Sequence, residues 1–281
     1  MSLGILTNVA ATYAQNNLNQ TQGSLQTVLQ QLSSGSRINS GADDAAGLSV
    51  ADGLRANEAA LTQSAQNAQN GVGLLQTADG ALSQVTNLLD RATTLATEAQ
   101  NGGLTTAQLT AADTEFQSIV TEIGNIGTAT NFNSNPVFST TTTNFVVTDG
   151  TATGTTSIAA TIGALTTASV GTATGGGAGA TLSGLSLVTG AAAAAAAVNT
   201  AVTDVSNQRG AIGANINQLN AAANVASTES VNLSSAESSI RSTNYGQATS
   251  DLAKFQVLSQ TGISALAQAN SVQQEILKLL Q

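Results

Sequence analysis

Apolar residues recur every seven positions in two long stretches of this chain. The first register consists of Leu61, Ala68, Leu75, Leu82, Leu89 and Ala96, and the second of Val198, Val205, Ile212, Leu219, Ala226 and Leu233. Val202, Ile216 and Ala223 fall on the intervening steps of the second register. Seven-residue spacing keeps one seam of a helix against a neighbour over many turns. The pattern predicts long helices in both halves of the chain, packed against each other and against copies of the chain.

A shorter helix with the same spacing is predicted near the start of the chain, over about residues 3–32. Its apolar positions include Leu18, Leu25 and Leu32, with Thr21 and Val28 between them. Gly35 follows, and glycine permits the left-handed conformation that ends many helices.

The long helix of the first half is predicted from Asp43 to about Gln100. Ser40 precedes Asp43 by three residues, which is a typical start signal. Asp43 and Asp44 are expected in the first turn, where the helix dipole favours negative charge. A second capping pair, Thr105 and Gln108, predicts the start of a shorter helix.

The middle of the chain lacks helical periodicity. Residues 144–148 are rich in β-branched and aromatic residues and predict a strand, with Asp149-Gly150 as a hairpin turn and residues 155–158 as the return strand. The Gly/Ala/Thr tract at 172–180 predicts an exposed, mobile loop.

Helical periodicity returns near Gly190 and continues to about Leu233, and a last helix is expected over about residues 240–280. The apolar face of that last helix is predicted to hold Leu252, Phe255, Leu258, Ile263, Leu266, Val272, Ile276 and Leu280. No repeat of 20–50 residues is present, which argues against a solenoid.

The expected fold is mainly α, with long antiparallel helices from both termini and a small β-hairpin region between them. Three regions are predicted. Residues 1–42 and 239–281 form an inner terminal coiled coil, residues 43–135 and 190–238 a helical bundle, and residues 136–189 a small β-rich, low-complexity region.

Composition indicates that this fold is completed by assembly. Only 8% of residues are charged and 2% are aromatic, so thin layers of Ala and Leu must replace a thick core. A lone pair of terminal helices would bury one apolar stripe and expose the other. We therefore expect residues 1–35 and 245–281 to be poorly ordered in the monomer and to gain structure when neighbouring subunits cover them. The residues expected to form subunit contacts are Leu18, Leu25, Leu32, Arg37, Asp43, Asp44, Leu252, Phe255, Leu258, Leu266, Ile276 and Leu280.

The missing residue types exclude several chemistries. The chain has no His and no Cys, which rules out a Ser-His-Asp triad, a Cys nucleophile and the common metal sites. We expect no catalytic residues, no cofactor and no metal.

The net charge of -9 argues against nucleic acid and anionic membranes as partners. The longest apolar run, residues 191–198, is shorter than the roughly 20 residues of a membrane span. No cleavable signal is visible at the N-terminus.

Some motifs allow a second interpretation. Asp43 and Asp44 would also fit a catalytic carboxylate pair, but a helix start with a partner such as Arg37 is favoured. The glycines of residues 175–179 lack the Lys and Ser/Thr of a phosphate loop, which favours a linker. Residues 140–143 are either O-glycosylation acceptors or, as we favour, a solvated loop.

Two motif regions resemble bacterial flagellin. Residues 32–40 read Leu-Ser-Ser-Gly-Ser-Arg-Ile-Asn-Ser, and Asp-Asp-Ala-Ala-Gly-Leu follows at 43–48. Near the other end, Arg-Gly-Ala-Ile-Gly-Ala at 209–214 and Ala-Gln-Ala-Asn at 267–270 resemble the C-terminal motifs of the family. Residues 131–133, Asn-Phe-Asn, match its entry into a β-hairpin. The large variable outer domain of the family is almost missing, because only about 50 residues separate Phe138 from Gly190.

The resemblance implies a secreted, extracellular subunit of the bacterial flagellar filament. It implies export in unfolded form through the flagellar type III apparatus, guided by an uncleaved N-terminus. It also implies partners: copies of the chain in a helical homopolymer, an export chaperone on the C-terminal helix, and the filament cap and hook-junction proteins.

Two departures from the family pattern alter these expectations. The acids that usually follow the Ile-Arg pair before the C-terminal helix are missing after Ile240-Arg241, so a salt bridge there is not expected. On the first bundle helix, the face that a Toll-like innate receptor reads in many flagellins keeps Arg91 and Leu95 but has Thr93 and Thr94 where charge is common. We expect weakened receptor binding and a structural ion pair from Arg91 to Asp90 or Asp113.

Three other functions compete with a filament subunit. A hook–filament junction protein shares related terminal motifs but is expected in few copies. An enzyme inserted into a flagellin scaffold is disfavoured by the short middle and the lack of His. An adhesin displayed by the polymer would lose surface binding if residues 151–179 were deleted.

Overall fold

The computed structural model describes residues 8–139, 142–148, 156–172 and 178–279. The chain divides into two compact units, one of residues 1–56 and 233–281 and the other of residues 57–232. The helices are α1 (Val9–Ser34), α2 (Ala45–Ala99), α3 (Thr106–Ala129), α4 (Leu187–Arg241) and α5 (Tyr245–Leu279). The strands are β1 (Asn131–Phe132), β2 (Asn135–Pro136), β3 (Thr142–Val146), β4 (Ser157–Thr161), β5 (Leu165–Thr166), β6 (Ser169–Thr172) and β7 (Ala178–Ala180). The predicted division into three regions stays a prediction.

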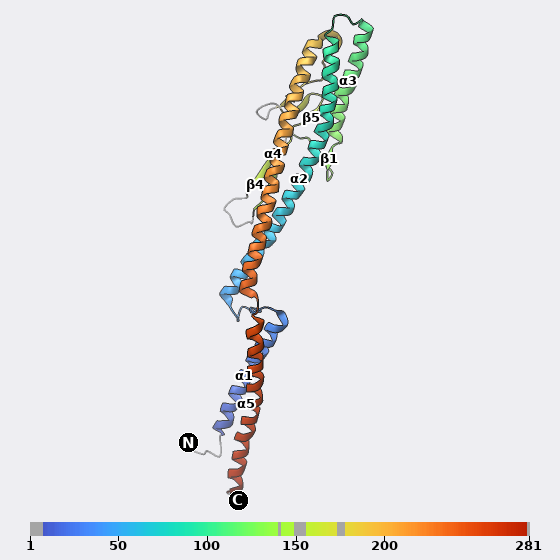
Figure 1. Cartoon of the computed structure of the whole chain (residues 1–281). Helices are drawn as coiled ribbons and strands as arrows, with labels where there is room; N and C mark the ends of the chain where they lie inside the picture. Colours follow the sequence, from blue (N-terminus) through green and yellow to red (C-terminus); the bar gives the residue numbers. More distant parts are fainter. Residues whose placement is uncertain (1–7, 140–141, 149–155, 173–177, 280–281) are drawn as a thin grey trace. The chain divides into compact units, whose positions relative to one another are not determined.

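The terminal helices α1 and α5 lie side by side and antiparallel, as predicted (Figure 1). Two hydrogen bonds, one near each end of α1, fix the antiparallel direction of the pair. The Asn8 side chain donates to the Ala269 carbonyl at 2.9 Å, and the Thr243 N–H donates to the Gly35 carbonyl at 3.0 Å. The two helices are therefore paired over the whole length of α1.

A side chain caps the N-terminus of α1, and a backbone N–H caps its C-terminus. Asn8 accepts from the Ala11 N–H at 3.0 Å, which satisfies one of the free donors at the helix start. Gly35 takes the left-handed conformation with φ 71° and ends the helix as its sequence predicts. The start predicted at residue 3 lies outside the described residues, and the predicted end at Leu32 is two residues early.

The long helix α2 begins at Ala45, so placing Asp43 and Asp44 in its first turn was wrong. Asp44 precedes the helix and accepts from the Gly47 N–H at 2.8 Å, which is the role of a capping residue. Asp43 lies in the preceding turn. The helix needs its cap before its first turn, and only one of the two acids can occupy that position.

The second unit is a bundle of α3 with parts of α2 and α4 (Figure 1). Both predicted heptad registers point into it. Residues 61, 68, 75, 82, 89 and 96 of α2 are buried, as are residues 198, 205, 212, 219 and 226 of α4. The capping box of Thr105 and Gln108 is present at the start of α3. The seven-residue spacing therefore identified the core-facing seam of both long helices.

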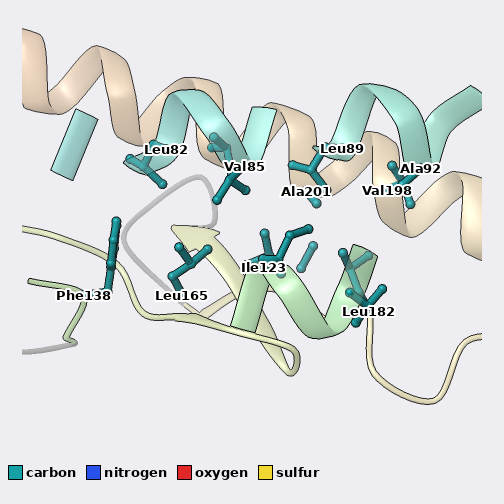
Figure 2. Packing of buried hydrophobic residues seen from close by; sticks show 14 of the residues in the cluster. Leu82, Val85, Leu89, Ala92, Ile123, Phe138, Leu165, Leu182, Val198 and Ala201 are labelled. Carbon is teal, nitrogen blue, oxygen red and sulfur yellow. The ribbon is translucent and has the colours of Figure 1, made fainter. Parts of the chain in front are cut away.

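The core of this unit is thin and built mostly from aliphatic side chains. Figure 2 shows Leu82, Val85 and Leu89 of α2 packed with Ile123 of α3 and with Leu165 of β5. Phe116 is the largest fully buried side chain in the described chain. Because few large residues are present, small side chains such as alanine allow the helices to approach closely.

Two short hairpins follow α3. In the first, β1 pairs with β2 through a two-residue turn at Asn133 and Ser134, both with positive φ, as in the turns that match the twist of hairpin strands. In the second, β3 pairs with β4 so that Phe145 lies opposite Ile158. Both predicted strands exist, each displaced by about two residues, and the predicted Asp149-Gly150 turn lies outside the described residues.

Strands β5, β6 and β7 form a small antiparallel sheet. The prediction of a mobile loop over 172–180 was wrong at both ends, because Thr172 ends strand β6, residues 178–180 are strand β7 and Ala180 is buried. The composition of this tract was misleading. Gly179 has no side chain, and this lets β7 approach the backbone of Val170 closely.

The last two helices are divided differently from the prediction. A non-helical Gly190 interrupts the first turns of α4, so the regular helix restarts there as expected. It then continues to Arg241, eight residues past the predicted end at Leu233, and α5 begins at Tyr245.

By length and composition α4 is apolar enough to span a membrane, with a mean hydropathy of 1.2 in its most apolar window. Helix α4 also carries buried core residues of the second unit, such as Ala194 and Val198, and the core helix of a protein can meet the same criterion.

Candidate assembly surface

The seam between α1 and α5 has the seven-residue spacing of a coiled coil. On α1 the less exposed residues include Ala11, Ala14, Leu18, Thr21, Leu25, Val28 and Leu32. On α5 they include Ala248, Leu252, Phe255, Ser259, Gly262, Leu266 and Ala269. The steps alternate between three and four residues, as knobs-into-holes packing requires. Of this seam only Val28 and Ala248 are buried, so the pair is thinly packed.

A second set of apolar side chains on the terminal helices faces solvent. It comprises Val9, Tyr13 and Leu29 of α1 and Tyr245, Val257, Leu258, Ile263 and Val272 of α5. Val257 is 65% exposed and Ile263 is 50% exposed. Such a concentration of exposed apolar residues on a helix pair is typical of a surface that another protein covers.

These exposed residues correct the predicted apolar face of the last helix. Leu252, Phe255 and Leu266 do face α1, but Leu258, Ile263 and Val272 point away from the seam. Ile276 lies in the last turns of α5, and Leu280 lies outside the described residues. The apolar residues of α5 therefore form one stripe in the seam and others beside it. The exposed residues of α1, Tyr245 and Val257 were missed, although their apolar type outside the heptad positions was a usable signal.

Charge is almost absent from this helix pair. Helix α1 has no Asp, Glu, Lys or Arg, and the first charged side chain of the sequence is Arg37. On α5, Asp251, Lys254, Glu275 and Lys278 are the charged residues. Few ions would have to be desolvated if a neighbour covered this surface, which lowers the cost of burying it.

Backbone pairing joins the segment after α1 to the segment before α5. Ser36 and Ser242 form an antiparallel bridge, and the Arg37 N–H donates to the Arg241 carbonyl at 2.6 Å. The Arg37 guanidinium donates to the Ile240 carbonyl at 3.0 Å. The expected pairing of Arg37 with the nearby aspartates was wrong, because its side chain forms a hydrogen bond with a backbone carbonyl instead. Arg241 forms an ion pair within its own helix, with Glu237 at 3.3 Å.

A tight turn precedes α2, and Asp43 organises it. One carboxylate oxygen of Asp43 accepts from the Asn39 N–H at 3.0 Å and from the Ser40 N–H at 2.8 Å. The Asn39 and Ser40 backbone bonds, followed by the Ser40 hydroxyl, lower the pKa of Asp43 from its ordinary value because they stabilise the carboxylate. These contacts describe a structural turn and give the carboxylate no catalytic geometry.

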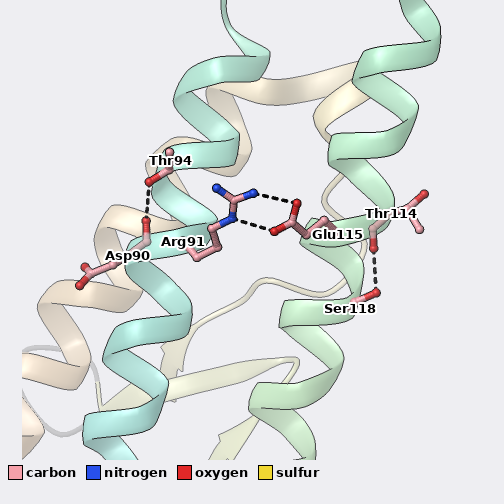
Figure 3. Close-up of polar contacts among 6 residues, drawn as sticks. All are labelled: Asp90, Arg91, Thr94, Thr114, Glu115 and Ser118. Carbon is pink, nitrogen blue, oxygen red and sulfur yellow. Dashed lines mark hydrogen bonds and ion pairs between the residues drawn. The ribbon is translucent and has the colours of Figure 1, made fainter.

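Arg91 lies on α2 and pairs with Glu115 of α3 (Figure 3). Its Nε and Nη2 atoms donate to the two Glu115 oxygens at 2.7 and 2.9 Å, so the predicted partners Asp90 and Asp113 were wrong. The hydrogen bond from Arg91 holds the pKa of Glu115 below its usual range. Leu95 is only 3% exposed and belongs to the core.

Within the part of the chain that the structure describes, Asp43, Asp44 and Glu115 take part in structural hydrogen bonds. Among the residues that the structure describes, no group of three or more acidic side chains is placed to hold a metal ion. The features that the terminal helices share are apolar exposure, low charge and heptad packing. Those features suit a surface that packs against other helices.

Family models of known proteins match both ends of the chain. The model described as the bacterial flagellin N-terminal helical region matches residues 5–143. The model described as the bacterial flagellin C-terminal helical region matches residues 195–280. The two matches include both helices of the terminal pair.

Full-length relatives give the same result. Flagellin of Listeria innocua is 30% identical over 98% of this chain and 98% of its own length. The flagellar filament 33 kDa core protein of Treponema phagedenis is 32% identical over 97% of this chain and 98% of its own length. A crystal structure of Bacillus cereus flagellin is 26% identical and covers 57% of this chain and 88% of that chain, with a TM-score of 0.46.

Proposed function

This chain belongs to the bacterial flagellin family and is a structural subunit of the flagellar filament, and from that premise we propose that α1 and α5 carry its main subunit contacts. The observation that carries this proposal is the exposed apolar set beside the α1–α5 seam, including Val257 at 65% and Ile263 at 50% exposure. Burying the exposed parts of such side chains in the filament stabilises it by about 1–2 kcal/mol each.

The same proposal assigns the predicted contact residues, apart from Ile276 and Leu280, to three roles. Leu18, Leu25 and Leu32 hold α1 against α5 together with Leu252, Phe255 and Leu266. Leu258, with the exposed residues around it, meets neighbouring subunits. Arg37, Asp43 and Asp44 shape the connection to α2, so their contribution to assembly is indirect. The support is their hydrogen bonding within the chain.

We expect the purified chain to form filaments without other proteins after salt is added, because salt strengthens the burial of apolar surface. Electron microscopy of the polymerised sample tests this. Long filaments are expected, whereas short closed rings would favour the hook–filament junction alternative. A chain that stays monomeric under every polymerising condition would contradict the proposal.

Membership of the family also supports a proposal about partners beyond the polymer itself. We propose export in unfolded form to the extracellular filament, an export chaperone on the exposed apolar residues of α5, and a cap and junction proteins at the filament ends. The support for the chaperone site is again apolar exposure, because α5 displays Val257, Leu258, Ile263 and Val272 before assembly.

Weak activation of a Toll-like innate receptor is a further expectation. Arg91 is held by Glu115, Leu95 is buried, and Thr93 and Thr94 give the face no charge. Each missing charged hydrogen bond costs about 1.5–3 kcal/mol, so potency should be lower by at least about tenfold. A reporter-cell assay against an enterobacterial flagellin measures this, and equal potency would refute it.

A further inference from the structure

A carboxyl group is buried beneath the small sheet of the second unit. Asp204 and Gln208 are each 3% exposed and lie four residues apart on α4. Residues with this spacing are neighbours on one helix face. The filament contacts proposed above use neither residue, so their burial needs another explanation.

Two acceptor atoms of this pair have no hydrogen-bond partner among the described residues. They are Oδ2 of Asp204 and Oε1 of Gln208. The amide nitrogen of Gln208 is already used, because it donates to the Gly163 carbonyl at 3.4 Å. Two buried acceptors cannot satisfy each other, and such groups are seldom left unpaired in folded proteins. Protonation of Asp204 would supply a donor for the Gln208 acceptor, which the four-residue spacing puts on the same face of α4.

The strands close tightly over this position. Gly171 of β6 has φ +75°, and a Cβ atom there would be 3.2 Å from the Asp204 Cβ and 2.9 Å from the Val205 nitrogen. From β7, the main-chain N–H of Ala180 faces the Asp204 carboxyl. The backbone of β6 thus lies directly against α4 beside the carboxyl, where little room is left for a hydrated counter-ion.

Among the residues that the structure describes, no cation forms an ion pair with Asp204. Residues 156–172 and 178–186, which include β4 to β7, contain no titratable side chain. On α4 and α2, Arg209 is bound to Asp79 at 2.8 Å. On α3, Glu122 is exposed and accepts from Asn125 at 3.2 Å. Burial therefore raises the pKa of Asp204, and the Ala180 N–H opposes this only in part.

We propose that Asp204 and Gln208 form a proton-binding site that fastens the β5–β6–β7 sheet to α4. In the protonated form Oδ2–H of Asp204 donates to Oε1 of Gln208, and the neutral carboxyl is compatible with its burial. Ionisation removes that bond and leaves an uncompensated charge under the sheet. The attachment of the sheet to α4 therefore weakens as the pH rises.

The sign of the pH dependence follows from the raised pKa. An unfolded chain has Asp204 near its ordinary pKa of 3.8, below the folded value. The stabilising contribution is fully present below the unfolded pKa and is lost as the pH rises through the folded pKa. Replacing Asp204 with Asn keeps an acceptor for Ala180 and supplies a permanent donor for Gln208.

The test uses the full-length monomer labelled with carbon-13 at its aspartate carboxyl groups. The sequence contains nine aspartates, and one signal is expected to titrate at higher pH than the others and to be missing from Asp204→Asn. In urea unfolding from about pH 4 to about pH 8, the midpoint of the native chain should fall relative to that of Asp204→Asn. At neutral pH the variant should unfold at higher urea.

The chain offers a matched control pair on α5. Asp251 also lies four residues from a glutamine and accepts from Gln247 at 3.1 Å, but Gln247 is exposed and Asp251 only half-buried. Asp251→Asn should not reproduce the higher urea midpoint at neutral pH that is expected of Asp204→Asn. An Asp204 carboxyl that titrates with the other aspartates, or equal pH profiles for Asp204→Asn and the native chain, would overturn the proposal.

A second variant keeps the test decisive if Asp204→Asn does not fold. Gln208→Met removes the acceptor Oε1 and keeps a long side chain in its place. The neutral form of Asp204 then loses its partner, so its titration midpoint should shift downward. A midpoint identical to that of the native chain would show that the two side chains share no proton.

Discussion

Filament assembly is expected to fail when charge is placed on the exposed apolar positions of α5. Val257→Glu combined with Ile263→Glu removes two side chains that each contribute about 1–2 kcal/mol when their exposed parts are buried. A loss of at least about 2 kcal/mol raises the critical concentration for polymerisation by more than about 25-fold. Burying an unpaired carboxylate costs more still. Sedimentation and electron microscopy after salt-induced polymerisation measure this effect.

The control for this experiment is the same kind of substitution outside the terminal helices. Val188→Glu changes a valine at the start of α4 that is 40% exposed. Its filaments should form at nearly the native critical concentration. Thermal unfolding of the Val257/Ile263 double variant should match that of the native monomer, because neither side chain is buried in the isolated chain. Normal filaments from the double variant would show that these positions lie outside the subunit contacts.

Gly127→Ala is expected to destabilise the second unit by about 3 kcal/mol. Gly127 lies in the last turns of α3, where a Cβ atom would overlap the carbonyl oxygen of Leu165 in β5. The obstacle is backbone in a paired strand, so it cannot move aside by a change of rotamer. For a unit of this size the loss corresponds to a decrease in Tm of about 6–12 °C. Circular dichroism during thermal unfolding measures it.

Gly80→Ala provides the matched control with the opposite sign. Gly80 lies in α2, is exposed, and has nothing within 4 Å of the position of its missing Cβ. The substitution should stabilise the helix by up to about 1 kcal/mol, because glycine loses more backbone entropy on folding. If both substitutions shift Tm in the same direction, the close approach of β5 to α3 is not what requires glycine at 127.

Much of the architecture was predicted from local pattern. The heptad registers of α2 and α4 identified core residues such as Leu75 and Leu219, and Thr105 with Gln108 marked the start of α3. These predictions succeeded because helix periodicity and capping depend on residues close together in the sequence. Family membership followed from motifs at 32–48 and near the C-terminus and was confirmed by the relatives.

Predictions that depended on the choice of partner were less successful. Arg91 has acids nearby in the sequence, but it pairs with Glu115, 24 residues away on α3. Arg37 binds the Ile240 carbonyl instead of a neighbouring aspartate. A charged side chain binds the acceptor that the packing of helices brings within reach, and sequence distance carries little information about that.

The sequence by itself determined that this chain forms long helices at both ends, with seams of small and aliphatic residues, little charge and no histidine or cysteine chemistry. Only the tertiary structure decided which apolar residues of α5 face α1, that β7 forms within a glycine-rich tract, and that Asp204 is buried under a sheet. The physical reason is that helix formation and amphipathicity depend on the spacing of residues that are close together in the sequence. Which face becomes buried depends instead on surfaces that meet only after distant segments have packed together.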